Sequence, residues 1–203
     1  MGNLVINIRG TTGAGKSTII KIILSRFNAQ PVFLGNIIRG HVCPHVFGKA
    51  LYVLGPYDKA TGGCDNIGTQ DEVCNLVRKF AAKGDVLFEG LLISGLFARY
   101  NALDNELAEH HFIHGFLDTP LQRCIDRVLS RRAAKGNTMP FDPYKTLIPK
   151  FEAVKVSRRK FEAAGGPDCE CCKVKPCKSR KKDVRTVPHL HAVETVFGWL
   201  KTG

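Results

Sequence analysis

The sequence predicts an α/β fold in which helices cover both faces of a mostly parallel β-sheet, giving three layers. Short apolar runs alternate along the chain with longer segments of helical periodicity, which is typical of strands joined by crossover helices. A glycine-rich stretch links the first apolar run to the first helical segment. With 203 residues and 44% apolar content, the chain is long enough for one domain with a sizeable core. We therefore expect a single domain over residues 1–203, with a lid near 130–150 and a basic, cysteine-rich insert near 165–183.

The glycine-rich stretch has the features of a phosphate-binding loop, or P-loop. It follows a predicted strand at Leu4–Ile8 and leads into a predicted helix from Lys16 to about Phe27. Its glycines let the backbone curl and present N–H groups to phosphate oxygens at a helix N-terminus, where we expect Lys16 to reach the β- and γ-phosphates of a nucleotide and Ser17 to ligate Mg²⁺. A turn that binds nothing is the alternative, and the flanking strand and helix argue against it. The residues of the loop expected to hold the phosphates are Gly13, Ala14, Gly15, Lys16, Ser17 and Thr18.

The region after this helix is predicted to be largely irregular. Pro31–Leu34 has the composition of a second strand, and from Gly35 to Gly68 glycines recur among histidines and aromatic residues. Only Lys49–Leu54 in this region has the alternation of a strand. Long glycine-rich connections in compact domains are usually functional, so we expect part of the site here.

The rest of the chain continues the alternation of strands and helices. Thr69 is predicted to cap a helix that ends at Gly84, with Glu72 completing a capping box, and Thr119-Pro120 is predicted to cap and open another helix. Further strands are expected at Asp85–Gly90, His111–Asp118 and Asp183–Val187, and further helices at Ile93–Leu107, Leu121–Ala134, Lys150–Ala164 and Ala192–Lys201.

Glu89 is the first catalytic candidate, because it ends an apolar strand. The carboxyl ends of parallel strands meet at one edge of the sheet, where the P-loop also lies. A carboxylate there orients Mg²⁺ through water or helps deprotonate an acceptor hydroxyl. The alternative is that Glu89 caps a helix at Leu91 and Leu92.

Asp65 is the first choice for the general base, because it follows paired glycines that allow close approach of the backbone. Asp58 and Tyr57 are candidates for binding the substrate. An aspartate that merely forms a turn is the alternative for either carboxylate. Tyr52, Tyr57 and Phe47 are weak candidates for stacking on a nucleobase, since aromatic residues in strands more often belong to the core.

Arg123, Arg127 and Arg131 are four residues apart on one predicted helix and so share a face. A row of arginines on a helix that leads into a proline-containing loop is typical of a lid that neutralises the transferring phosphoryl group. We expect this role for Arg127 and Arg131. A solvated charged face is the alternative.

The net charge is +12, and most of it lies in one part of the chain. From Leu121 to Arg185 there are 18 Lys and Arg and 7 Asp and Glu, so this part carries 18 − 7 = +11. Such a field attracts polyanions, and nucleic acid is the partner that we expect. The alternative is a lid that only screens the phosphates of a nucleotide.

The eight cysteines fall into two sets. Four are scattered singly, and we expect them to remain free thiols: Cys43, Cys64, Cys74 and Cys124. The others cluster between residues 169 and 177, where Cys169, Cys172 and Cys177 have spacing that suits Zn²⁺, with His189 or His191 as a fourth ligand. Two CxxC pairs are absent, so a surface insert with free thiols is favoured over zinc.

The sequence contains no run long enough to span a membrane and no signal-peptide pattern at Leu4–Ile8. We therefore expect a cytoplasmic protein with no membrane partner. The oligomeric state is left open.

The P-loop, the Phe88-Glu89-Gly90 strand end, the Leu117-Asp118-Thr119-Pro120 turn and the arginine helix together resemble the nucleoside and nucleotide kinase branch of the P-loop proteins. Within it, Gly62-Gly63-Cys64-Asp65 and the basic C-terminal third are similar to bacteriophage kinases that phosphorylate 5-hydroxymethyluracil in DNA. This resemblance implies an ATP- and Mg²⁺-dependent kinase that acts on DNA in the host cytoplasm. It places ATP at Gly13, Gly15, Lys16, Ser17 and Thr18 and a flipped-out base near Asp65. The cysteine cluster departs from the plain kinase pattern.

Two other functions compete with this hypothesis. One is a kinase of free deoxynucleosides or their monophosphates. The other is a nucleic-acid-binding NTPase that acts as a switch. The arginine helix argues against the switch, because hydrolysis needs a positioned water, and the sequence has no obvious glutamine or switch segment for that role.

Overall fold

The computed structural model describes residues 2–58, 63–137, 140–165 and 180–202. Within these residues, seven strands form one sheet in the order β2-β3-β4-β5-β1-β6-β7. Strands β4, β5, β1, β6 and β7 run parallel, whereas β3 and β2 are antiparallel to their neighbours at one edge. The strands are β1 (Leu4–Arg9), β2 (Gln30–Leu34), β3 (Ile37–Val46), β4 (Lys49–Leu54), β5 (Asp85–Glu89), β6 (His111–Leu117) and β7 (Asp183–Val187). The predicted mostly parallel sheet is confirmed.

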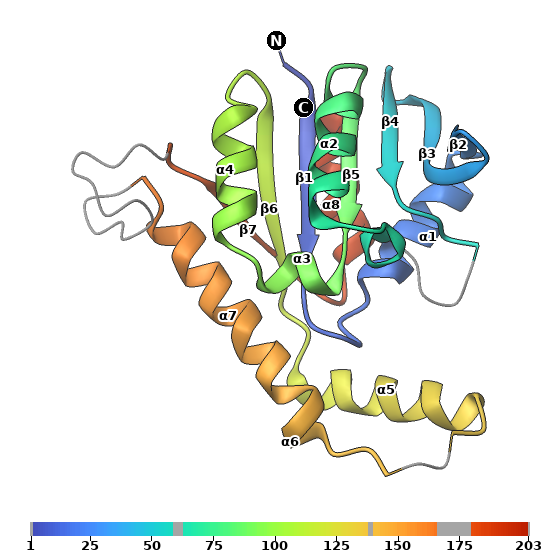
Figure 1. Cartoon of the computed structure of the whole chain (residues 1–203), viewed down its shortest axis with the longest axis vertical. Helices are drawn as coiled ribbons and strands as arrows, with labels where there is room; N and C mark the ends of the chain where they lie inside the picture. The colour runs from blue at the N-terminus through green and yellow to red at the C-terminus, as the bar shows by residue number, and fades with distance from the viewer. Residues whose placement is uncertain (1, 59–62, 138–139, 166–179, 203) are drawn as a thin grey trace.

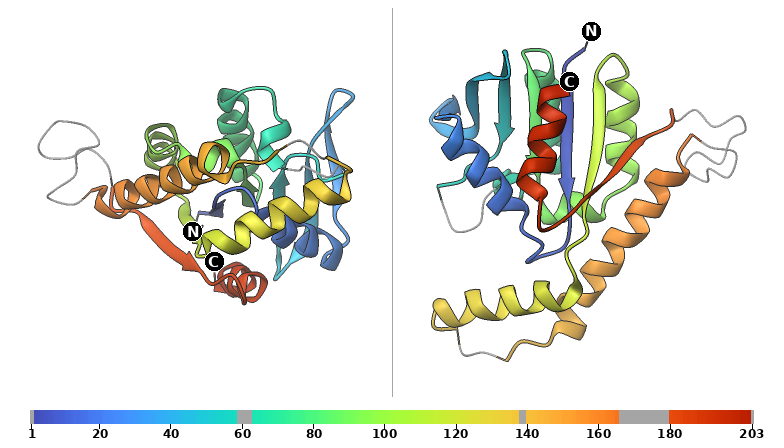
Figure 2. Two further views of the ribbon diagram at one scale, coloured as in Figure 1. Left: turned by 90° about the horizontal axis from the view of Figure 1, so that it is seen from below. Right: turned by 180° about the vertical axis from the view of Figure 1, so that it is seen from behind.

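Helices cover both faces of the sheet, so the three predicted layers are also confirmed (Figures 1 and 2). Helices α1 and α8 lie on one face, and α2 and α4 lie on the other. Helices α5, α6 and α7 gather at the edge where the parallel strands end. The described helices are α1 (Lys16–Arg26), α2 (Gln70–Ala81), α3 (Leu91–Gly95), α4 (Ala98–Glu106), α5 (Leu121–Ala134), α6 (Pro143–Thr146), α7 (Ile148–Ala163) and α8 (Ala192–Thr202), with a 3₁₀ helix, η1, at Gly63–Asn66.

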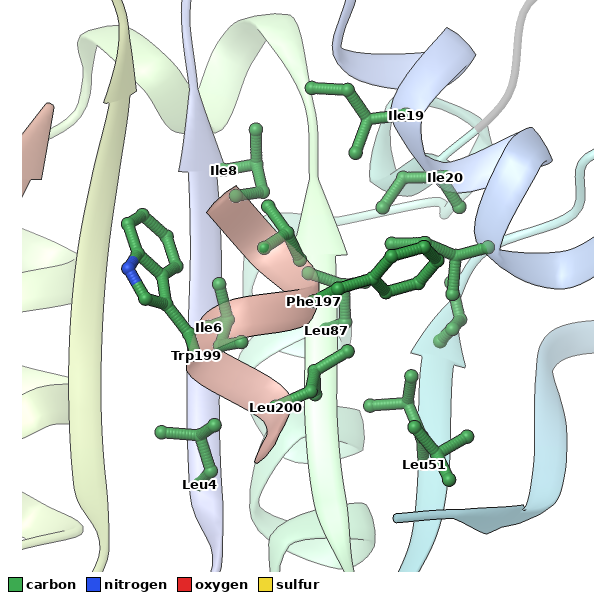
Figure 3. Packing of buried hydrophobic residues seen from close by; sticks show 14 of the residues in the cluster. Leu4, Ile6, Ile8, Ile19, Ile20, Leu51, Leu87, Phe197, Trp199 and Leu200 are labelled. Atoms are coloured by element: carbon green, nitrogen blue, oxygen red, sulfur yellow. The ribbon is translucent and has the colours of Figure 1, made fainter. Parts of the chain in front are cut away.

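Strand β1 is buried along its whole length because both of its faces are covered. Its alternate residues Leu4, Ile6 and Ile8 pack against α1 and α8, where Phe197 and Trp199 contribute large rings (Figure 3). Val5 points to the other face and packs in the cluster that contains α2 and α4. This central strand therefore fixes the place where the following loop leaves the sheet.

The expectation of a single strand between residues 35 and 68 was wrong, because β3 pairs with both β2 and β4. Gly40 and Pro44 weaken the strand pattern in the sequence. The irregular pairing tolerates them: the register shifts between Cys43 and Val46, around Pro44. Gly40 is also needed for packing, since a Cβ there would lie 2.6 Å from the carbonyl oxygen of Val53.

The predicted helix over residues 93–107 is instead divided into α3 and α4. Leu96 adopts an extended conformation and ends α3. The cap at Thr69 is confirmed, since its side chain accepts the N–H of Glu72. The carboxylate of Glu72 pairs with Arg39. The four predicted single cysteines are buried free thiols.

A buried ionic cluster attaches the segment before β7 to the body of the fold. His114 on β6 and Asp104 on α4 are both fully buried, with His114 Nε2 2.8 Å from Asp104 Oδ2. Arg180 Nε donates to the other oxygen of Asp104 at 2.6 Å. The side chain of Lys182, also buried, lies 3.4 Å from it. The imidazole of His114 stacks on Phe161, so the cluster also contacts helix α7.

Candidate nucleotide-binding and phosphoryl-transfer site

The P-loop connects β1 to α1 and has the backbone that its glycines permit. Gly13 and Gly15 have φ angles of 84° and 107°, in the region that other residues rarely adopt. A Cβ on Gly13 would also lie 2.5 Å from the carbonyl oxygen of Cys124 on α5. Gly13 is therefore required both for the turn and for the close approach of α5 to the loop.

Lys16, the first residue of α1, is buried inside this loop. Its Nζ donates to the carbonyl oxygens of Gly10 at 2.7 Å and Thr11 at 3.1 Å. Burial lowers the pKa of Lys16, and the nearby Glu89 carboxylate opposes that shift. Two carbonyl oxygens of the loop thus hold the Lys16 side chain in place.

Glu89 ends β5 beside the P-loop, as the sequence predicts, and it is only 1% exposed. Its Oε1 accepts a 2.8 Å hydrogen bond from the Ser17 hydroxyl and lies 3.4 Å from the Tyr57 hydroxyl. Burial raises the pKa of Glu89, whereas Lys16 and the Ser17 hydrogen bond lower it. A hydroxyl and a buried carboxylate in contact are hard oxygen donors, so Ser17 and Glu89 fit a Mg²⁺ ion, directly or through water.

The glycine-rich connection wraps around Glu89. A Cβ on Gly63 would lie 2.5 Å from Glu89 Oε1, and one on Gly55 would lie 2.4 Å from the backbone of Gly63. The backbone therefore reaches the carboxylate only because both positions are glycine. The close approach that the paired glycines predict is present in this structure at Gly63.

Asp65 makes the helix-capping contact that the alternative interpretation of the sequence assigns to Glu89. Its carboxylate accepts the backbone N–H groups of Leu91 at 2.8 Å and of Leu92 at 3.3 Å, and so caps α3. Asp65 is exposed, and it lines the same cavity as Glu89. Tyr57 is buried against Glu89, whereas Asp58 is exposed at the end of a described range.

Helix α5 carries four arginines, and Arg127 among them bonds to the P-loop. Arg127 Nη1 donates to the carbonyl oxygens of Gly13 at 3.0 Å and Ala14 at 3.1 Å. Arg131, one turn further, also lines the cavity, and the exposed Arg123 is not among the lining residues. The predicted Thr119 cap is wrong: Pro120 occupies the N-cap position, and the Thr119 hydroxyl donates to Ala14 O at 2.8 Å.

These side chains surround one cavity of about 830 Å³. The residues after β7 contribute to its wall, which the sequence analysis did not foresee. These residues could have been predicted, because sites form at the carboxyl ends of parallel strands and they directly follow β7, which ends at Val187. The lining residues are Thr11 to Ile22 except Ile20, together with Asp65, Glu89, Leu91, Leu117, Arg127, Ser130, Arg131, His189, Leu190, Ala192, Val193 and Glu194.

Other sequence candidates do not meet this cavity. Tyr52 stacks on Phe80 in the core, with 5.0 Å between ring centroids, and Phe47 packs edge-on against Phe27. The proposed zinc ligands Cys169, Cys172 and Cys177 lie outside the described residues. Among the residues that the structure does describe, no group of three His, Cys, Asp or Glu side chains is arranged to hold a metal.

The P-loop with its buried lysine, the serine–carboxylate pair and the arginine helix define a P-loop kinase. The family model for 5-hmdU DNA kinase matches residues 1–162, and the chain belongs to this family.

Individual relatives agree with this assignment. A protein of Pseudomonas phage PaMx11 named 5-hmdU DNA kinase is 38% identical over 178 residues, covering 82% of this chain and 89% of that protein. One of Delftia phage PhiW-14 with the same name is 31% identical over 176 residues, covering 79% of this chain and 65% of that protein. An adenylyl-sulfate kinase of Pseudomonas aeruginosa is 32% identical over 148 residues, covering 68% and 66%. In the described residues, no helix is long and apolar enough to cross a membrane.

Proposed function

We propose that this chain transfers the γ-phosphate of ATP to the hydroxymethyl oxygen of 5-hydroxymethyluracil in DNA. The observation that carries the chemistry is the hydrogen-bonded pair of Ser17 and Glu89 beside the buried Lys16. The choice of acceptor is based on the phage relatives, which are named 5-hmdU DNA kinases.

On the phosphate side, the P-loop N–H groups and Lys16 hold the triphosphate of the nucleotide. Mg²⁺, held by Ser17 and by Glu89 directly or through water, would neutralise charge on the phosphate oxygens. Arg127 already bonds to the loop, and with Arg131 it forms a lid that places positive charge over the transferring group.

On the acceptor side, Asp65 lies on the cavity wall with an exposed carboxylate. The acceptor oxygen forms a bond to the γ-phosphorus, the bond from that phosphorus to the oxygen it shares with ADP breaks, and the hydroxyl proton passes to Asp65. A carboxylate suffices as this base, because the loose transition state of phosphoryl transfer needs little charge on the attacking oxygen.

The positive charge of the C-terminal part supports DNA as the acceptor. Nine basic residues lie on α5 and α7, and both helices begin at the edge of the sheet where the parallel strands end (Figure 1). If these side chains contact DNA phosphates, the affinity for DNA falls steeply as the salt concentration rises, because counterions are released from the DNA on association. A kinase of free nucleotides would bind DNA only weakly and would not phosphorylate it.

The test is transfer of labelled phosphate from ATP to four acceptors in parallel. These are DNA containing 5-hydroxymethyluracil, ordinary DNA, free deoxynucleosides and deoxynucleoside monophosphates. Label in the modified DNA alone supports the proposal. Label in the free compounds alone would make this a precursor kinase, and release of phosphate without an acceptor would make it an NTPase. Lys16→Ala is the control, since it removes the cation that both kinase functions need.

A further inference from the structure

Helix α3 forms the rim of the cavity on the side of the proposed base. Its first residue, Leu91, lines the cavity together with Asp65. The next residue, Leu92, is 62% exposed, and Leu96 at the end of the helix is 40% exposed. Single exposed leucines are common on protein surfaces. Leu92 directly follows Leu91, which lines the cavity.

The backbone of α3 is anchored to the P-loop and to the proposed base. Ser94 Oγ accepts the N–H of Gly10, the first residue of the loop, at 3.1 Å, and donates to Gly90 O at 2.6 Å. Asp65 accepts the N–H of Leu92 itself at 3.3 Å. The exposed leucine is therefore held at a fixed distance from the groups proposed to transfer the phosphate.

A buried arginine strengthens this anchor. Arg9, the last residue of β1, is fully buried, and its Nη1 donates to the carbonyl oxygens of Ile93 at 3.0 Å and Leu96 at 3.1 Å. Its guanidinium lies over the ring of Phe161 on α7, 4.4 Å from the centroid. Burying a cation is unfavourable unless its donors are paired, so this arrangement is a strong constraint on α3.

Helix α7 packs against α3 and carries exposed basic residues. It runs past α3, and a Cβ on Gly95 would lie 3.7 Å from that of Ala153 (Figure 1). The exposed basic residues on α7 are Lys150, Lys155, Arg159 and Lys160. A DNA duplex opened at one base pair is complementary to this surface. Its phosphates can pair with the cations of α7, and the gap between its stacked bases can accept the leucine side chain.

We propose that Leu92 is the wedge that enters the duplex and fills the space left by the target base when that base turns into the cavity. This inference rests on the proposed function. A base in a duplex cannot reach a buried P-loop while stacked, so it must leave the helix, and the lost stacking needs compensation. An apolar side chain inserted at that step provides it, and its rigid support keeps the flipped base in register with Asp65.

The test compares two acceptors that differ only in strand pairing: a duplex with one 5-hydroxymethyluracil opposite adenine, and the same modified strand alone. For Leu92→Ala we expect kcat/KM on the duplex to fall at least about tenfold, and on the single strand to stay within about twofold of the parent. Leu92→Met should restore most duplex activity, because it refills the gap. Leu129→Ala, at a similarly exposed leucine on α5, is the matched control and should change neither.

Several outcomes would overturn the wedge. Equal losses on both acceptors would show that Leu92 acts on the fold or on transfer itself, and no loss on the duplex would show that the side chain is not used. A parent protein that modifies only the single strand would also refute it. If the parent modifies neither DNA, the proposed function fails first, and the single-strand arm distinguishes the two failures.

Discussion

The hydroxyl of Ser17 donates a 2.8 Å hydrogen bond to Oε1 of Glu89 and so joins the first turn of α1 to the end of β5. The two residues are 72 positions apart in the chain. Their contact places a hydroxyl, a buried carboxylate and the Lys16 ammonium within one small volume at the edge of the sheet.

Replacing Glu89 with Gln should reduce transfer about 10- to 100-fold, because Gln keeps an oxygen that accepts from Ser17 but loses the charge that we propose holds Mg²⁺ in place. The loss should be partly recovered at high Mg²⁺ concentration. Measuring kcat against Mg²⁺ concentration checks this. Tyr57→Phe, which removes only the more distant partner at 3.4 Å, is the control and should retain the Mg²⁺ dependence of the parent. An unaltered Mg²⁺ curve for the Gln variant would contradict the assignment.

Asp65→Asn separates the two roles of this carboxylate. Asn caps a helix about as well as Asp, so α3 and the thermal stability should be preserved. Transfer should fall about 10²- to 10⁴-fold, because the amide cannot accept the proton. ATP binding by titration calorimetry should be unchanged. Near-normal turnover would refute Asp65 as the base, and Asp65→Ala should lose about 1 kcal/mol of stability in addition.

Arg127 and Arg123 provide a matched pair on one helix. Arg127→Ala removes the donor to Gly13 O and Ala14 O and should lower kcat about 10²- to 10³-fold, because positive charge over the transferring phosphoryl group is lost. Arg123→Ala removes the same charge from an exposed position outside the cavity and should leave kcat within about twofold. Steady-state kinetics with saturating ATP checks this. Similar losses in both variants would mean that overall charge, and not position, matters.

Stability should depend on pH through His114. Burial lowers its pKa to about 4, with Asp104 opposing the shift and Arg9 and Lys182 adding to it. Because the folded pKa lies below the unfolded value of 6.5, the unfolded chain binds the extra proton first as the pH falls. Stability is therefore highest above pH 6.5 and declines toward pH 4, by roughly 3 kcal/mol for this group alone.

Urea unfolding between pH 4 and pH 7.5 measures this effect. His114→Gln keeps a donor for Asp104 and should flatten the curve between pH 4 and 6.5, although it lowers stability at neutral pH. His45→Gln, at an exposed histidine, should leave the slope of the parent intact. If the slope survives in the His114 variant, other groups cause the acid sensitivity.

Elements with strong local signals could be predicted from the sequence. The P-loop, the strand that ends in Glu89 and the helix capped by Thr69 each depend on residues within a few positions of one another. Strand β3 could not be predicted in the same way, because its Gly40 and Pro44 disfavour a strand locally and its pairing with β2 and β4 overrides them. The division between α3 and α4 was missed for a similar reason: Arg9, distant in sequence, binds the carbonyl oxygens at the break.

Local patterns in the sequence predict the P-loop, since glycines, lysine and serine in one short segment leave little freedom for another structure. They also predict a carboxylate that faces this loop from a neighbouring strand. Which carboxylate makes which contact depends on tertiary packing: Glu89 bonds to Ser17, whereas Asp65 caps α3. Hydrogen bonds between residues 26 and 72 positions apart depend on how the chain packs, and local patterns in the sequence carry no record of them.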